Sequence, residues 1–296
     1  MRRLIAVAAA AATMIVAPPA FAQVKPVDAL KKQFVAGQGV RVKEISRTWA
    51  GKDEYIGATR EGVVAFGPKG VTGAETSRTP VLSAKLKKQL AAQVKQNPEL
   101  ADAVELLTER TYMVSTGKHY YVHGGLFSQL LPDDKFWVRG AGDPSFAALG
   151  DQLINVFEPA TLKHLLATGK HTGPRYRGTL TFAELYKVSP SFRVQFGPKP
   201  TGKIGKSPIS WRLTLDERNL AQRLAIDWTM PLTKKVAIRG TTETRYSDWG
   251  ADITVKTPTA ESIISIDDLV KEIMRPPTPI DENYVAVPPS DDGTVQ

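Results

Sequence analysis

The sequence predicts an α+β protein built on a large antiparallel sheet. The first observation is an alternation of apolar and polar residues between residues 208 and 258, in which Trp211, Leu213 and Leu215 occupy every second position. Side chains alternate across a strand, so this pattern indicates strands with one buried and one wetted face. Antiparallel meanders have such faces, whereas parallel sheets are covered on both sides. Helices elsewhere in the chain would cover the apolar face.

The second observation is another group of strand-like runs in the first half of the chain. β-branched residues separated by Gly and Pro predict strands at 40–49, 55–66 and 71–79. Three further strands are predicted at 109–115, 119–123 and 135–139, the first two of them joined by a hairpin turn at 116–118.

The third observation is a helical period between and after these strands. The predicted helices lie at 27–34, 82–94, 146–157, 161–167 and 266–274. In 82–94, leucine or valine recurs every fourth residue and lysines fill the other faces. We expect this helix to pack on the sheet; the alternative is a helix that lies on a membrane surface.

Two segments between the helices and the last strands are less regular. Residues 175–188 predict a strand, or a strand followed by the start of a helix. Residues 189–205 are rich in Pro and Gly and predict a loop.

The first 22 residues have the pattern of a secretory signal peptide. Two arginines precede an apolar run from Leu4 to Val16, and small residues lead to a cleavage point after Ala22. No later stretch is long and apolar enough to cross a bilayer. The chain has no cysteine, so we expect neither disulfides nor a lipid anchor on an N-terminal cysteine. We therefore expect a secreted or envelope protein, with a disordered tail at 275–296.

The formal net charge of +9 is spread along the chain. This excess is typical of a soluble surface, and the alternative is attraction to anionic lipids or wall polymers. An exported chain without a nucleic-acid-binding motif is not expected to bind nucleic acid.

Candidate residues for catalysis are few. His119 and His123 could share a strand face, but no third ligand lies nearby in sequence, so we expect no metal site. Residues 115–118 match the S-x-x-K form of penicillin-recognising enzymes, yet they fall in the predicted hairpin turn and lack the partner motifs. We expect no cofactor and no enzyme activity.

Apolar residues are instead in surplus, because both strand groups and the central helices carry apolar faces. A curved antiparallel sheet closed over by helices has an interior. From periodicity alone a filled core is favoured, and the alternative is an apolar cavity for a lipid or acyl chain.

Several segments resemble actinobacterial lipoproteins of the LppX/LprG type, which belong to the LolA/LolB-like superfamily. The similar segments span most of the chain from Asp28 to Pro258, and they are residues 117–140, 157–166, 175–192, 211–224 and 244–258. The lipobox cysteine that anchors many of these relatives is absent.

The resemblance implies a half-open β-barrel at 23–274, with helices covering the concave face and an apolar pocket between them. It implies carriage or sensing of a lipid or lipidated molecule in the cell envelope, without catalysis. The helix near 149–157 would gate entry. The predicted cavity-lining residues are Val64, Phe66, Tyr112, Val114, Tyr121, Phe136, Leu153, Phe157, Leu213 and Trp228.

The alternative function is an envelope interaction or structural module with a filled core, which binds a protein or a wall polymer through its surface. In either case a membrane surface or an envelope protein is the expected partner besides the ligand. We expect the chain to be a monomer.

Overall fold

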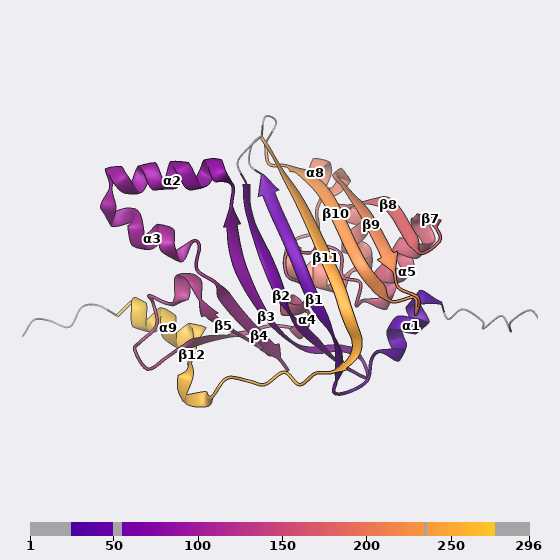
Figure 1. The fold of residues 1–296 in the computed structure, drawn as a ribbon, viewed down its shortest axis with the longest axis horizontal. Helices are drawn as coiled ribbons and strands as arrows, with labels where there is room; N and C mark the ends of the chain where they lie inside the picture. Colours follow the sequence, from indigo (N-terminus) through magenta and orange to yellow (C-terminus); the bar gives the residue numbers. More distant parts are fainter. Residues whose placement is uncertain (1–24, 50–54, 234–235, 276–296) are drawn as a thin grey trace, which may run out of the picture.

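The computed structural model describes residues 25–49, 55–233 and 236–275. The strands of this part of the chain form one open, curved sheet in the order β12-β6-β5-β4-β3-β2-β1-β11-β10-β9-β8-β7 (Figure 1). Helices lie against one face, so the predicted α+β class with a large, mainly antiparallel sheet is confirmed. The predicted signal peptide lies outside the described residues, as does the predicted tail beyond Arg275.

The strands follow the alternation of the sequence closely. Their bounds are β1 Gln38–Trp49, β2 Tyr55–Gly67, β3 Gly70–Leu82, β4 Thr111–Thr116, β5 His119–Gly124, β6 Trp137–Ala141, β7 Lys170–Thr172, β8 Arg175–Thr181, β9 Pro208–Leu215, β10 Ala221–Pro231, β11 Ala237–Asp252 and β12 Ile263–Ser265.

Strand β1 joins the two strand groups into one sheet. It pairs antiparallel with β2 on one side and with β11 on the other, so that Lys43 lies opposite both Glu61 and Arg245. The last strand, β12, is the exception to the antiparallel pattern, because it pairs parallel with β6. The segment 253–262 connects β11 to β12 across the sheet (Figure 1).

The helices fall into two sets. Behind the strands in Figure 1 lie α4 Pro144–Leu149, α5 Pro159–Thr168, α6 Phe182–Val188, α7 Pro190–Phe196 and α8 Gly202–Lys206. The others flank the sheet and are α1 Pro26–Lys32, α2 Ala84–Gln96, α3 Ala101–Leu106 and α9 Ile266–Ile273.

The hydrophobic core lies between the first set of helices and strands β1, β2, β8, β9, β10 and β11. Trp211 is fully buried there. A Cβ on Gly178 would come within 2.6 Å of its ring and a Cβ on Gly169 within 2.4 Å, so glycine at these two positions makes room for the indole.

Two helix predictions need correction. The helix predicted at 146–157 ends at Leu149, because Gly150 takes a positive φ of 64° that stops it, so the predicted gating helix at 149–157 is wrong. The loop predicted at 189–205 contains α7 and α8. Pro190 is placed at the start of α7, where its missing N–H is no loss, and the Ser189 hydroxyl accepts a hydrogen bond from the Phe192 N–H.

Helix α2 forms where it was predicted, but its expected packing on the sheet is wrong. Ser83 caps its first turn, and none of its residues is buried. It extends away from the end of β3 at the margin of the molecule (Figure 1). The alternative, a position on a membrane surface, stays a prediction. Within the described residues, no helix has the length and apolar character needed to span a bilayer.

Candidate functional site

The sheet has two faces of opposite character, which the alternation along β1 separates. Val42 and Glu44 are buried beneath the helices, on the side that we call the helix face. Lys43, Ile45 and Arg47 point to the opposite side, which the helices leave uncovered and which we call the open face. The two faces offer different chemistry to a ligand, so each is considered in turn.

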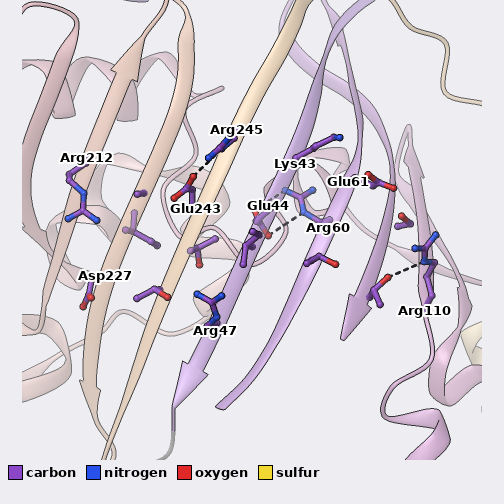
Figure 2. A pocket seen from close by; sticks show the side chains of 18 residues that line it. Lys43, Glu44, Arg47, Arg60, Glu61, Arg110, Arg212, Asp227, Glu243 and Arg245 are labelled. Atoms are coloured by element: carbon purple, nitrogen blue, oxygen red, sulfur yellow. Dashed lines mark hydrogen bonds and ion pairs between the residues drawn. The ribbon is translucent and has the colours of Figure 1, made fainter. Parts of the chain in front are cut away.

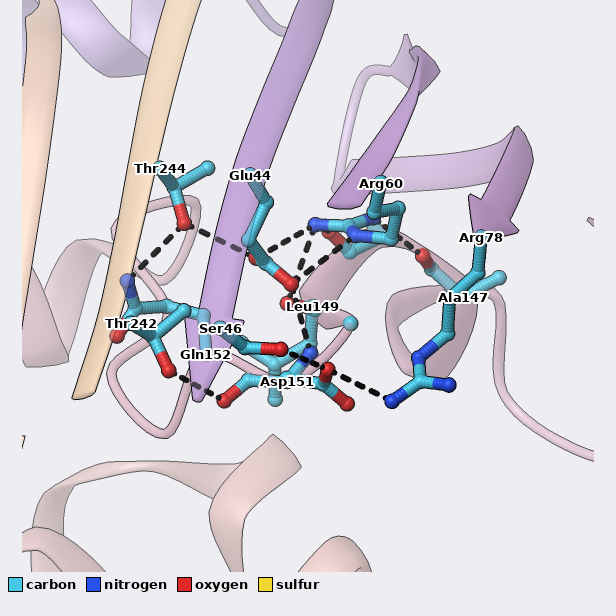
Figure 3. Close-up of polar contacts among 12 residues, drawn as sticks. Glu44, Ser46, Arg60, Arg78, Ala147, Leu149, Asp151, Gln152, Thr242 and Thr244 are labelled. Atoms are coloured by element: carbon cyan, nitrogen blue, oxygen red, sulfur yellow. Dashed lines mark hydrogen bonds and ion pairs between the residues drawn. The ribbon is translucent and has the colours of Figure 1, made fainter. Parts of the chain in front are cut away.

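The centre of the helix face holds a buried ion pair between Glu44 and Arg60 (Figure 3). Their oxygen and nitrogen atoms lie 3.0 Å apart, and the side chains are 1% and 4% exposed. Arg60 also donates hydrogen bonds to the carbonyls of Ala147, Ala148 and Leu149, at 3.0, 3.3 and 3.3 Å. Arg60 thus satisfies the last carbonyls of α4, which have no partner within the helix.

Asp151 extends this polar cluster to neighbouring strands. Its carboxylate accepts hydrogen bonds from Ser46 and, at 3.1 Å, from Arg78, while its N–H donates to Glu44. Thr242 on β11 donates to its carbonyl at 3.1 Å. Residues 147–152 are therefore tied to four adjacent strands, β3, β2, β1 and β11, by charged and polar contacts (Figure 3).

Beside this cluster the helix face is apolar and closely packed. Phe66 contacts the rings of Phe157 and Trp249, with centroids 5.6 and 5.8 Å apart. Four of the predicted cavity-lining residues lie in the hydrophobic core, and two more pack against it: Val64, Phe66, Phe157 and Leu213, then Leu153 and Trp228. Side chains of the chain itself surround these six residues. Their role in lining a ligand cavity stays a prediction.

The open face carries a hollow of about 700 Å³ over the middle of the sheet (Figure 2). It reaches from Arg212 on β9 across Ile45 on β1 to Thr79 on β3. The cations around it come from several strands and one loop: Lys43, Arg47, Arg110, Arg212 and Arg245. Three carboxylates from the open face also line it, Glu61, Asp227 and Glu243, and the buried pair of Glu44 and Arg60 borders it as well.

A second hollow of about 630 Å³ adjoins the first, and its wall holds aromatic side chains together with Glu61 and Glu75. Tyr112, Val114 and Trp137 line it from the sheet, and the crossing segment 256–259 lines it from above. Glu61, Ser77 and Arg110 border both hollows. We therefore treat them as one groove, the open-face groove, with a basic end over β1, β9 and β11 and an aromatic end over β4 and β6.

Aromatic rings form a row at the aromatic end. Tyr112 stacks on His123 with centroids 5.8 Å apart, and His123 lies 5.4 Å from Trp137. The Nδ1 atom of His123 is 2.9 Å from the carbonyl oxygen of Phe136. The row crosses β4, β5 and β6 and lines this part of the face with ring side chains.

Four predicted site residues lie on or next to β4, β5 and β6, outside the continuous hydrophobic core, although Val114 and Tyr121 are buried there. Tyr112 and Val114 line the groove, and Tyr121 lies directly opposite Val114 on β5. Phe136 is 54% exposed just before β6. The structure thus divides the predicted set between the packed helix face and the region of β4, β5 and β6.

Ion pairs neutralise only part of the charge on the open face. Glu243 contacts Arg223 and Arg245, and Asp227 contacts Arg239 at 2.8 Å. The hydrogen bond from Arg223 lowers the pKa of Glu243 below its ordinary value, although partial burial opposes this. Glu243 is therefore charged at neutral pH, and the remaining cations leave the face basic.

The residues considered for metal binding or catalysis lie on β4, β5 and the turn between them. The described part of the chain contains no group of three or more His, Asp or Glu side chains arranged to hold a metal ion. His119 and His123 occupy the two ends of β5. The Ser115 hydroxyl donates to the carbonyl of Pro144, and residues 115–118 form the predicted β4–β5 hairpin.

Two features of the site were missed by sequence reasoning. The first is the buried pair of Glu44 and Arg60. It could have been predicted, because Glu44 follows Val40 and Val42 at the alternate positions of β1 that are buried. A charge at such a position signals a buried partner. The second is the basic end of the groove. It could not have been predicted from the sequence, since it depends on which strands pair.

No family model matches this sequence, and no curated protein matches it either. Among solved structures, a hypothetical protein from Chlamydia trachomatis has 12% identity and a TM-score of 0.27, covering 79% of this chain and 98% of its own. A LolA superfamily protein from Nitrosomonas europaea has 9% identity and a TM-score of 0.28, with coverages of 77% and 93%. A DUF1329 family protein from Desulfovibrio piger has 10% identity and a TM-score of 0.29, with coverages of 78% and 93%.

At TM-scores below 0.3 these likenesses carry no statement about function. One of the three belongs to the superfamily that the sequence resembles. None of the three is described as an LppX- or LprG-type lipoprotein, so that narrower assignment stays a prediction.

Proposed function

We propose that this protein is a non-enzymatic binding protein of the cell envelope, whose open-face groove holds a lipid with an acyl chain and an anionic head. The observation that carries the proposal is the union of an aromatic end and a basic end in one groove, on the face that no helix covers. The extracytoplasmic location rests on the signal-peptide pattern of residues 1–22.

The aromatic end suits an acyl chain. Tyr112, Val114 and Trp137 present apolar surface on one side, and Pro258 in the crossing segment presents it on the other. Each methylene removed from water there would contribute about 0.8 kcal/mol. A chain of several methylenes would therefore gain enough to offset the ordering of the lipid.

The basic end suits an anionic head. Lys43, Arg47 and Arg212 line the adjoining hollow, and no carboxylate of the described chain forms an ion pair with them. The guanidinium group matches phosphate and carboxylate geometry with two parallel hydrogen bonds. A neutral zwitterionic head would gain less from these cations than a net anionic one.

A second candidate is an envelope interaction module that binds an acidic protein or a wall polymer. The packed helix face favours it, because six of the residues predicted to line a cavity lie in or against the hydrophobic core. The basic open face also fits such a partner. The two candidates differ in whether the aromatic end of the groove takes part in binding.

Titration of the purified chain with short-chain phosphatidylglycerol and phosphatidylcholine, followed by native mass spectrometry, tests the proposal. We expect phosphatidylglycerol to bind at least tenfold more tightly. Ser77→Trp should abolish binding, because Ser77 lies where the two hollows meet. Thr229→Trp is the matched control, since Thr229 is exposed on the same face and outside the groove.

Equal binding by the Ser77 and Thr229 variants would overturn the groove assignment. Absence of any lipid adduct, together with binding of an acidic polymer that Ser77→Trp leaves unchanged, would favour the interaction module. If Ser77→Trp retains the lipid and Phe157→Ala loses it, the lipid binds on the helix face and not in the open-face groove.

A further inference from the structure

Cations continue on the open face beyond the groove, toward the β7 edge of the sheet. Lys170 on β7 lies directly opposite Arg177 on β8, and Arg177 lies directly opposite Arg212 on β9. All three are exposed, and Arg175 is exposed two residues before Arg177 on the same face. No carboxylate of the described chain forms an ion pair with any of the four.

A second row of cations crosses the next three strands. Arg223 on β10 lies opposite Arg245 on β11, and Arg245 lies opposite Lys43 on β1. Glu243 contacts the first two, so one carboxylate serves two guanidinium groups. Each row therefore places like charges side by side on three neighbouring strands, and the rows are offset by two residues where β9 meets β10, because Arg212 lies opposite Ala225.

Such rows are unfavourable in the absence of a ligand. Side chains directly opposite each other in an antiparallel pair have Cβ atoms about 5 Å apart, and like charges at that distance destabilise the sheet. A soluble surface normally interleaves both signs of charge. A bound anion would reverse the sign of this contribution, because each cation would then face a phosphate or carboxylate oxygen.

We propose that these two rows form an extended site for a molecule with several phosphate groups. Neighbouring strands are about 4.8 Å apart, so the five steps from β7 to β1 span about 24 Å, which exceeds the size of a single phosphate. This inference rests on the proposed function in one respect: the anion would be the head of the same lipid. A soluble polyphosphate would present the same chemistry without an acyl chain.

Phosphate is the ligand group that we propose, because a terminal phosphate carries up to two negative charges and three acceptor oxygens, more than a carboxylate offers. Arg175, Arg177, Arg212, Arg223 and Arg245 all lie in the two rows. Each can offer two parallel N–H donors to one phosphate, which a lysine cannot do. Binding should weaken strongly with salt, because these exposed charges are screened over about 8–10 Å at moderate ionic strength.

The test titrates the full chain with inorganic polyphosphate and, separately, with orthophosphate and polyglutamate of matched charge, by calorimetry at two salt concentrations. We expect polyphosphate to bind at least a hundredfold more tightly than orthophosphate and tenfold more tightly than polyglutamate. The triple variant Lys170→Gln, Arg175→Gln, Arg177→Gln should weaken polyphosphate at least tenfold. Its affinity for phosphatidylglycerol, which carries one phosphate, should stay within twofold.

The matched control removes three lysines from the helix side of the molecule, at Lys199, Lys203 and Lys206, which are exposed in and before α8. This control lowers the net charge by the same amount as the triple variant, and it should weaken polyphosphate binding less than twofold. Glu243→Gln should tighten polyphosphate, because it frees two guanidinium groups.

An equal loss of polyphosphate affinity in both triple variants would overturn the site, because it would show that the polyphosphate responds only to the net charge of the protein. Equal affinity for polyglutamate would overturn the assignment to phosphate. Polyphosphate binding without any lipid adduct would support this site while the proposed lipid function fails. Lipid binding without polyphosphate binding would overturn this site while supporting the proposed lipid function.

Discussion

The two halves of the sheet use the same alternating strand pattern but differ in how deeply they are packed. Strands β1, β2, β8, β9, β10 and β11, with α4 to α8 behind them, form the packed half, which contains almost all of the continuous hydrophobic core. Strands β4, β5, β6 and β12, with α2, α3 and α9 around them, form the thin half. There, Leu107, Leu126 and Phe136 remain more than half exposed.

The difference comes from what covers each half. In the packed half, the short helices between residues 144 and 206 lie behind the strands. In the thin half, α2 leads away from the sheet and α3 returns toward β4, and the segment 256–259 lines the groove on the open face. Strand alternation fixes which side chains share a face, but a second layer decides whether that face is buried.

The largest expected effect is the loss of the buried pair that ties the packed half together. Arg60→Met leaves the Glu44 carboxylate buried without its cation, which should lower the free energy of unfolding by about 3–5 kcal/mol. Urea denaturation measures this. The double variant Glu44→Met, Arg60→Met should be more stable than the single one, because no uncompensated charge remains. A single variant within about 1 kcal/mol of wild type would contradict the role assigned to the pair.

Leucine truncations compare the two halves directly. Leu165 in α5 is fully buried in the core, so Leu165→Ala should cost about 2–5 kcal/mol. Leu107, just after α3, is 51% exposed, and Leu107→Ala should cost less than about 0.5 kcal/mol. Equal costs in thermal or urea denaturation would show that the thin half is as well packed as the other half.

A glycine in α2 tests how far this helix is independent of the sheet. Ala91→Gly should lower the stability of the helix by about 1 kcal/mol through backbone entropy. Because no residue of α2 is buried, amide exchange should accelerate at 84–96 while the global unfolding midpoint stays unchanged. A matching shift of the global midpoint would mean that α2 is coupled to the core.

The smallest effect concerns the exposed pairs of the open face. The pKa of Glu243 is lowered in the folded chain, chiefly by its hydrogen bond with Arg223, so its charge stabilises the fold above the unfolded pKa. This contribution is lost as the pH falls through the lowered pKa. The free energy of unfolding of the wild type should exceed that of Glu243→Gln by about 0.2–1 kcal/mol at pH 7, a small difference because solvent screens the exposed ion pair.

The difference between the two proteins should shrink toward zero well below pH 4.5, the ordinary pKa of a glutamate. Denaturation midpoints at pH 7, 5 and 3 measure it. A difference that grows on acidification would reverse the assigned sign.

Strand positions were predictable because they depend on local alternation. The run from Ile209 to Leu215 and the hairpin at 116–118 both appear where the sequence placed them. The end of α4 was less predictable, because apolar residues continue to Phe157 after the helix stops at Gly150. The candidate site was predictable only in part: Tyr112 and Val114 line the groove, whereas Phe66 and Leu213 lie in the core.

The sequence by itself determined the alternation of faces, the class of the fold and the excess of positive charge, because each depends on residues close together in the chain. Only the tertiary structure decided which strands are neighbours. Glu44 meets Thr244 across 200 residues, and Lys170, Arg177 and Arg212 become adjacent through pairing alone. Register places side chains in rows, and no local pattern encodes it. The basic rows and the groove beside them are therefore properties of the folded sheet.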